Sequence, residues 1–126
     1  MESRKELAAE KKRCHSHNCA QAVVCTYCDL VGLPEQTGKD IAVSFGGGMG
    51  TREGTCGALV GAGIILGLKT KDRELSKARM KDIMTRFQER NGATRCCLLK
   101  GIGTGKVLRE CPDCVADASE FLEEYL

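Results

Sequence analysis

Nine of the 126 residues are cysteines, and their thiols are the side chains of this chain best suited to chemistry. A cysteine thiolate can exchange disulfides, act as a nucleophile or bind a soft metal or an iron–sulfur cluster, whereas a buried neutral thiol is a small apolar side chain. The compartment decides which chemistry applies, because an oxidising one converts pairs of thiols into structural disulfides.

Two features of the sequence favour a reducing compartment. Residues 1–13, MESRKELAAEKKR, are charged throughout and contain no apolar signal-peptide core. The longest apolar run, residues 56–68, has about two-thirds of the length of a membrane span and is rich in glycine. We therefore expect a cytoplasmic protein without a membrane span, in which metal, cluster or thiol redox chemistry is favoured over a disulfide scaffold.

The sharpest local motif is Cys111-Pro112-Asp113-Cys114. We expect Cys111 at the N-cap of the last helix, with Pro112 at its first position. The helix dipole and the free N–H groups would then lower the pKa of the Cys111 thiol and make it a nucleophile, with Cys114 or Cys56 as the resolving thiol. The alternative for Cys114 is a small residue of the core. A thioredoxin-like fold is disfavoured, because the surrounding βαβ pattern is absent.

Two further groups of potential ligands have weaker spacing. Cys25 and Cys28 lie in the middle of a predicted helix, where filling the core is favoured over binding a metal. Segment 14–19, CHSHNC, has ligand types at a spacing that fits no common zinc motif. We interpret His15 and His17 as part of an exposed connection.

Composition and motifs argue against several other classes of function. A net charge of +2, from 19 basic and 17 acidic residues in mixed order, gives no strong field for nucleic acid. The glycine-rich segment 45–50 lacks a following Gly-Lys-Ser/Thr, and segment 101–106 is one residue short of a phosphate loop and continues with Val107 in place of the hydroxyl residue. No Cys-x-x-Cys-His haem motif occurs, and no serine has the context of a hydrolase triad.

The elements that must position these cysteines are helices. Apolar residues recur at helical spacing and no strand-like alternation is present, which predicts an all-α, single-domain bundle of about five helices with a glycine-rich loop. The predicted helices cover residues 18–31, 35–45, 56–69, 72–90 and 112–125. Thr55 is expected to cap the third of them. Segment 94–99 is too short to assign.

The parts outside these helices have different expected roles. Residues 1–17 form a peripheral charged helix or arm, since Leu7 is the only large apolar residue after Met1, and residues 18–126 form the cysteine-bearing bundle. Glycines at i,i+4 spacing in 56–69 would let another helix pack closely. A chain with no Trp and glycine-faced helices is also a candidate for a homodimer.

The cysteine pattern resembles that of a known family. Asn18-Cys19-Ala20, the glycine cluster at 45–50, the CGALVG segment at 56–61, Cys96, and Cys111 followed by Val115 resemble the redox-active proteins named for the pattern C_GCAxxG_C_C. The resemblance implies four functional cysteines, which are Cys19, Cys56, Cys96 and Cys111. Cys97 competes with Cys96 for the third position. A related domain in split-Soret cytochromes, where an iron–sulfur centre accompanies haem, implies a cluster without haem here.

Three hypotheses for the function therefore stand. In the first, the four family cysteines hold an iron–sulfur cluster for electron transfer to a redox partner whose identity is open. In the second, the chain is a dithiol–disulfide oxidoreductase that uses Cys111 and Cys114. In the third, the four family cysteines form a structural zinc site without redox activity.

Overall fold

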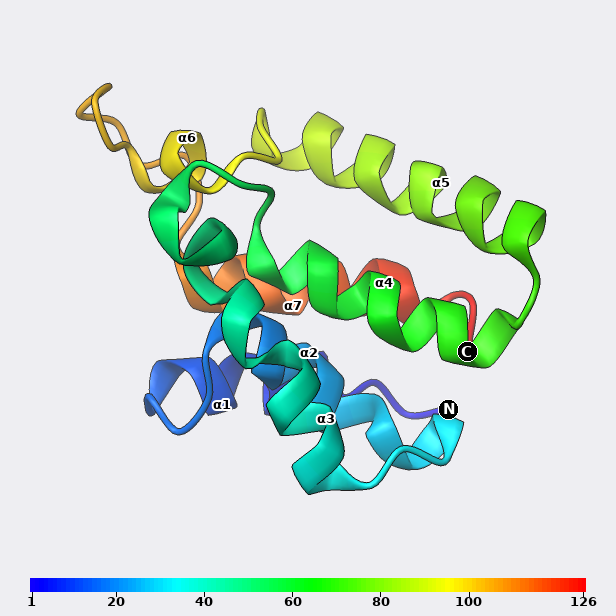
Figure 1. The fold of residues 1–126 in the computed structure, drawn as a ribbon. Coiled ribbons are helices and arrows are strands. Elements are labelled where there is room, and N and C mark those ends of the chain that lie inside the picture. The colour runs from blue at the N-terminus through cyan, green and yellow to red at the C-terminus, as the bar shows by residue number, and fades with distance from the viewer.

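Seven α-helices and no strand make up the protein in a computed structural model that describes residues 1–126 (Figure 1). The helices are α1 (Lys5–Arg13), α2 (Cys19–Tyr27), α3 (Glu35–Ala42), α4 (Gly57–Thr70), α5 (Arg73–Asn91), α6 (Cys96–Lys100) and α7 (Cys111–Glu123). Short turns of 3₁₀-helix follow α2 and α3, at Cys28–Val31 and Val43–Phe45, and a π-turn covers Gly48–Arg52. The all-α prediction is confirmed, with α1 and the short α6 in addition to the five predicted helices.

Local signals set several of the helix boundaries. Asn18 caps α2 in a reciprocal capping box with Gln21, because its side chain accepts from the Gln21 N–H and the Gln21 side chain accepts from the Asn18 N–H. The Asp72 carboxylate accepts from Leu75 N–H at the start of α5, and Gly92 ends α5 in the left-handed conformation. The expected cap at Thr55 is replaced by Cys56, which itself occupies the N-cap of α4.

The helices enclose one core, with α4 near its centre (Figure 1). Helix α4 contacts α2 on one side, α5 on another and α7 on a third, and α7 in turn packs on α1. The largest fully buried side chains are Tyr27, Phe87, Phe121, Leu59, Ile65, Leu66, Ile83, Leu99 and Leu122. The core is thus built mainly from aliphatic residues with a few aromatics.

The close approach of α4 to α2 depends on two of the glycines of α4. A Cβ atom at Gly61 would lie 2.7 Å from the Ala20 carbonyl oxygen, and one at Gly57 would collide with the sulfur of Cys19 at the start of α2. The expected close packing therefore holds for this pair. It does not hold for the second pair, since Gly63 leaves ordinary space to Met80 and Gly67 faces open space.

Helix α1 is part of the bundle rather than a detached arm. Ala8 and Ala9 are 0% and 1% exposed, whereas Leu7, the large apolar residue of α1, is 62% exposed. Lys5 forms a salt bridge to Glu120 of α7 at 2.9 Å. Small side chains bring α1 and α7 together here, and for that reason a search for large apolar residues misses the contact.

None of the seven helices combines the length and the apolar character that a bilayer crossing requires.

Candidate functional site

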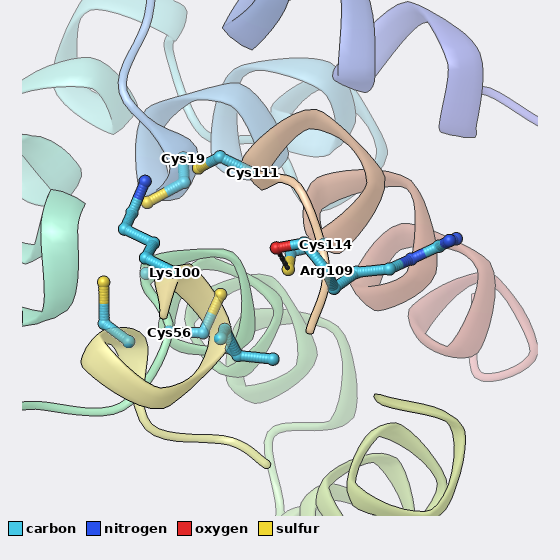
Figure 2. A pocket seen from close by; sticks show the side chains of 9 residues that line it. Cys19, Cys56, Lys100, Arg109, Cys111 and Cys114 are labelled. Atoms are coloured by element: carbon cyan, nitrogen blue, oxygen red, sulfur yellow. Dashed lines mark hydrogen bonds between the residues drawn. The ribbon is translucent and has the colours of Figure 1, made fainter. Parts of the chain in front are cut away.

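Five cysteines from distant parts of the chain line one small pocket (Figure 2). They are Cys19, Cys56, Cys96, Cys111 and Cys114, joined by Gly57, Leu99, Lys100 and Arg109. All nine cysteines of the chain are free thiols. The four residues implied by the family resemblance thus lie in one place, together with the second cysteine of the Cys-Pro-Asp-Cys motif.

Cys19 is held at the first position of α2, directly after the Asn18 cap. The Gly47 N–H donates to its Sγ at 3.5 Å from the glycine-rich loop. Gly57 of α4 packs against the same sulfur, so closely that a Cβ atom there would collide with it. The loop and the start of α4 therefore fix the sulfur from two sides.

Cys56 and Cys96 are brought together by a short antiparallel bridge between Thr55 and Arg95. The Cys56 N–H donates to the Thr94 carbonyl at 2.8 Å, and the Cys96 N–H donates to the Gly54 carbonyl at 2.9 Å. Cys56 follows Thr55 and Cys96 follows Arg95, so the bridge brings the two cysteines together, one just before α4 and one at the start of α6.

The glycine-rich loop closes over Cys96. Gly48 has a φ of +61°, and a Cβ atom there would lie 2.5 Å from the Cys96 Cβ. Only glycine satisfies both conditions without strain. Gly48 thus combines a positive φ with a close approach to Cys96.

Cys111 and Cys114 enter the pocket from the first turn of α7. Glu110 occupies the N-cap, so Cys111 is the first helical residue and Pro112 the second, one position later than expected. The Cys114 Sγ donates to the Arg109 carbonyl at 3.8 Å. The segment before α7 is therefore tied to the helix by one of the pocket thiols.

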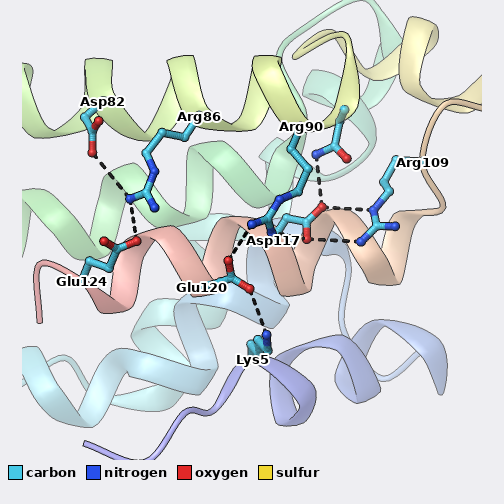
Figure 3. A network of polar contacts seen from close by, with 9 residues as sticks. Lys5, Asp82, Arg86, Arg90, Arg109, Asp117, Glu120 and Glu124 are labelled. Carbon is cyan, nitrogen blue, oxygen red and sulfur yellow. Dashed lines mark hydrogen bonds and ion pairs between the residues drawn. The ribbon is translucent and has the colours of Figure 1, made fainter.

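The buried carboxylate of Asp117 holds the segment before α7 in place through Arg109 (Figure 3). Asp117 of α7 is 4% exposed and accepts from the guanidinium groups of Arg109 and Arg90 and from the Asn91 amide. The Arg109 contacts, at 3.0 and 3.3 Å, form a two-pronged pair. Asp117 thereby connects the end of α5 and the pocket-lining Arg109 to α7.

The five thiols are not equivalent in acidity. The Cys111 thiol donates to Cys19, and this contact, aided by the Gly47 and Ala20 N–H groups, lowers the pKa of Cys19 to about 6 although burial opposes it. Donation to Cys19, together with burial, raises the pKa of Cys111. Cys19 is therefore the thiolate of this pair and Cys111 its proton donor.

Cys56 and Cys114 form a second pair, in which the one Cys114 proton faces two acceptors, Cys56 and the Arg109 carbonyl. The Cys114 thiol lowers the pKa of Cys56, with help from the N–H groups of Ala58 and Leu59 at the start of α4, and the pKa of Cys114 is raised in return. The pKa of Cys96 is raised by burial. Helix starts do stabilise thiolates here, but the helices are α2 and α4.

The expected role of Cys111 as the low-pKa thiol of the pocket is therefore corrected. The expectation considered the start of α7 alone, whereas Cys111 faces Cys19, which receives N–H groups from both α2 and the glycine-rich loop. Lys100 extends toward Cys19 and Cys111 (Figure 2) and its charge favours the thiolate forms of Cys111 and Cys96.

The remaining four cysteines lie outside the pocket lining. Cys97 is buried, but the pocket contains its neighbour Cys96. Cys25 and Cys28 are buried on α2 and the turn after it, and Cys14 is exposed. The structure thus separates Cys96 from Cys97, which the cysteine order alone left in competition.

Sequence reasoning missed three polar residues of the site. Lys100 and Arg109 line the pocket and Asp117 anchors Arg109. The only signal for Asp117 was a charged residue on the otherwise apolar face of the last helix, between Cys114 and Phe121. Nothing in the sequence pairs it with an arginine eight residues away across a loop.

Comparison with known proteins agrees with the geometry. The profile of one family, described as "Putative redox-active protein (C_GCAxxG_C_C)", matches residues 17–125. No curated protein and no solved structure matches the chain. Because the match covers nearly the whole chain, including every pocket cysteine, the protein belongs to the C_GCAxxG_C_C redox-active family.

Proposed function

We propose that the protein binds an iron–sulfur cluster through Cys19, Cys56, Cys96 and Cys111 and passes single electrons to a redox partner. The observation that supports this proposal is the convergence of these four thiols, which lie up to 92 positions apart in the sequence, on one pocket. We further propose a cytoplasmic setting, where thiols stay reduced.

The pocket suits such a group by its donor set and its surroundings. All potential ligands are thiols, the ligand type that iron–sulfur clusters prefer, and no histidine or carboxylate lines the pocket. The glycines at 48 and 57 keep side-chain atoms away from two of the sulfurs. When bound, the cluster supplies one-electron oxidation and reduction.

The surrounding residues tune the charge of the site. The Gly47 N–H donates to the Cys19 sulfur, a contact of the kind that raises a reduction potential. Lys100 offsets part of the negative charge that four thiolates bring. With Cys56 bound to the cluster, the Cys114 S–H would donate to the Arg109 carbonyl, 3.8 Å away, and hold this lining in place.

The test is an anaerobic purification. We expect a coloured protein that contains iron and acid-labile sulfide, and a reversible one-electron step in its visible spectrum. A protein without iron and sulfide after reconstitution, or one with stoichiometric zinc in the pocket, contradicts the proposal.

Cys96 and Cys97 form a matched pair for this test. Both are buried, but only Cys96 lines the pocket. Cys96→Ser should lower the iron and sulfide content strongly, whereas Cys97→Ser should leave both near the level of the unchanged protein. Equal losses in both variants would assign the effect to folding rather than to ligation.

A dithiol–disulfide oxidoreductase is the second candidate, favoured by the two thiol pairs, Cys19 with Cys111 and Cys56 with Cys114. In this reaction the Cys19 thiolate attacks a partner disulfide, and a partner thiolate leaves and takes up a proton. Cys111 then gives its proton to the second partner sulfur as its own sulfur displaces that group from Cys19. The products are a Cys19–Cys111 disulfide and a reduced partner dithiol.

Mass spectrometry of the iron-free protein distinguishes this candidate. After reaction with a disulfide substrate, a loss of two hydrogens located at Cys19 and Cys111 supports it. Unchanged thiols after prolonged exposure contradict it.

A further inference from the structure

We propose a second metal site, separate from the cysteine pocket, in which His17, Cys25 and Glu35 bind a divalent cation of the zinc class. One ligand atom from each of these residues lies within 4.8 Å of the other two. The three come from the connection between α1 and α2, from α2 itself and from the start of α3. None of them lines the pocket of the four family cysteines.

The Ser16 hydroxyl contacts the ring of His17. It lies between the Lys11 carbonyl, 3.2 Å away, and His17 Nδ1, 2.6 Å away. When the hydroxyl donates to the carbonyl, it accepts the Nδ1 proton of His17, and Nε2 then presents a lone pair. A contact of this kind at the other ring nitrogen orients metal-binding histidines.

The Nε2 edge of His17 is buried. The Nε2 atom of His17 is shielded from solvent and has no hydrogen-bond partner. A buried, unsatisfied acceptor costs about 1–3 kcal/mol. The sequence predicts that both histidines lie in an exposed connection. His15 is exposed, but the Nε2 atom of His17 is buried.

The other two residues supply sulfur and oxygen. Cys25 is 8% exposed and its thiol lies 3.9 Å from the Glu35 carbonyl oxygen, so the side chains of both residues share this corner. A thiolate and a carboxylate together balance the charge of a divalent cation. Glu35 is exposed, so its carboxylate is free to turn inward.

The mixed donor set indicates the metal. Zinc accepts Cys sulfur, His nitrogen and carboxylate oxygen at about 2.0–2.3 Å, which places tetrahedral ligand atoms roughly 3.5 Å apart and requires only a modest closure here. The Cys28 S–H donates to the Cys25 carbonyl, so Cys28 is not one of the proposed zinc ligands. Three protein ligands leave a fourth position for water, as in open zinc sites.

A bound cation would join three segments that are otherwise linked mainly by packing. Thermal stability therefore gives a readout besides metal content. The full-length protein is purified without metal, zinc is added in measured amounts, and bound zinc and Tm are recorded for the unchanged chain and for His17→Asn, Glu35→Gln and His15→Asn.

The exposed His15, two residues away, is the matched control. We expect His17→Asn to lose one equivalent of zinc and the associated rise in Tm, Glu35→Gln to bind about tenfold more weakly, and His15→Asn to behave as the unchanged chain. In the unchanged chain, X-ray absorption of the zinc equivalent that His17→Asn fails to bind should show one sulfur ligand together with nitrogen and oxygen ligands.

Two results would overturn the proposal. One is equal zinc binding in the unchanged chain and His17→Asn. The other is a first shell made of sulfur alone, which would place all zinc in the cysteine pocket. Iron and sulfide content of His17→Asn should equal that of the unchanged protein, so failure of this site and failure of the proposed cluster are separate outcomes.

Discussion

At the scale of single residues, Gly48 of the glycine-rich loop and Gly57 and Gly61 of α4 are explained by what they leave room for. Gly57 and Gly48 lie against Cys19 and Cys96, where a methyl group would meet sulfur or Cβ. Gly61 lies against the backbone of α2 at Ala20. The cysteines and glycines therefore belong to one packed site, in which the glycines determine how closely the thiols can approach the neighbouring backbone.

Gly57→Ala tests this relation. The new methyl group would collide with the Cys19 sulfur and the Phe45 carbonyl, so we expect a loss of about 1–3 kcal/mol in the free energy of unfolding. Gly67→Ala, in the same helix but facing open space, should instead stabilise by up to about 1 kcal/mol. Urea denaturation measures both. A similar stabilisation by both changes would contradict the packing role of Gly57.

The acidity of the thiols gives a second prediction at this scale. In reduced, metal-free protein, the ultraviolet absorbance of thiolates should show a step near pH 6 from Cys19. Cys111→Ser should retain the step because a hydroxyl can still donate, Cys111→Ala should move it to higher pH, and Cys19→Ser should abolish it. A step that survives Cys19→Ser and disappears in Cys111→Ser would make Cys111 the thiolate.

The same shift has a definite sign for stability. Because the folded-state pKa of Cys19 is below its ordinary value of 9.0, its contribution to the free energy of unfolding is complete above pH 9. The contribution decreases as the pH falls from 9 to about 6, where the folded state also takes up the proton. Cys19→Ser should remove this part of the pH dependence of unfolding.

At the scale of elements, the sequence predicts those parts of the fold that local signals determine. Helix α5 was predicted within about a residue at each end, because its apolar spacing lies between an Asp cap and an Asn-Gly stop. Helix α6 has five residues, too few to display a period. For residues 1–17 the sequence predicts a peripheral charged helix or arm, and it misses the packing of α1 on α7 because that contact uses Ala8 and Ala9 rather than Leu7.

The candidate site likewise has residues that the sequence predicts and contacts that it does not. The sequence predicts the pocket cysteines from their residue type and order, because no other side chain supplies a thiol. The partners that set their acidity were not, because the pairing of Cys19 with Cys111 depends on the crossing of α2 and α7. Asp117 was missed for the same reason, since its partners lie on other elements.

Asp117→Asn tests the support that α7 gives to the pocket. The amide removes the negative charge and one acceptor oxygen from a buried position to which Arg90, Arg109 and Asn91 all donate, so we expect a loss of about 1–3 kcal/mol in the free energy of unfolding. Glu124→Gln removes an exposed pair with Arg86 and should change it by no more than about 0.5 kcal/mol. Equal effects in urea denaturation would show that burial of Asp117 contributes nothing.

At the scale of the whole molecule, the pocket is the place where the chain is held together. Its thiols come from α2, α6, α7 and the residue that precedes α4, and the bridge at Thr55 and Arg95 joins segments 40 residues apart. A group that binds these thiols in the folded state, and cannot find them together in the unfolded chain, must stabilise the fold.

Removal of the proposed cluster should therefore lower the thermal stability. For a ligand present at about 100 times its Kd, the loss is about 2.7 kcal/mol, which corresponds to roughly 10 °C in Tm for a chain of this size. In Cys96→Ser the difference between loaded and stripped protein should vanish, because a ligand is missing. In Cys97→Ser both forms should shift together and the difference should remain. A Tm that is the same before and after stripping would mean that the thiols converge for disulfide exchange, which requires only pairs, rather than for a cluster that links all four segments.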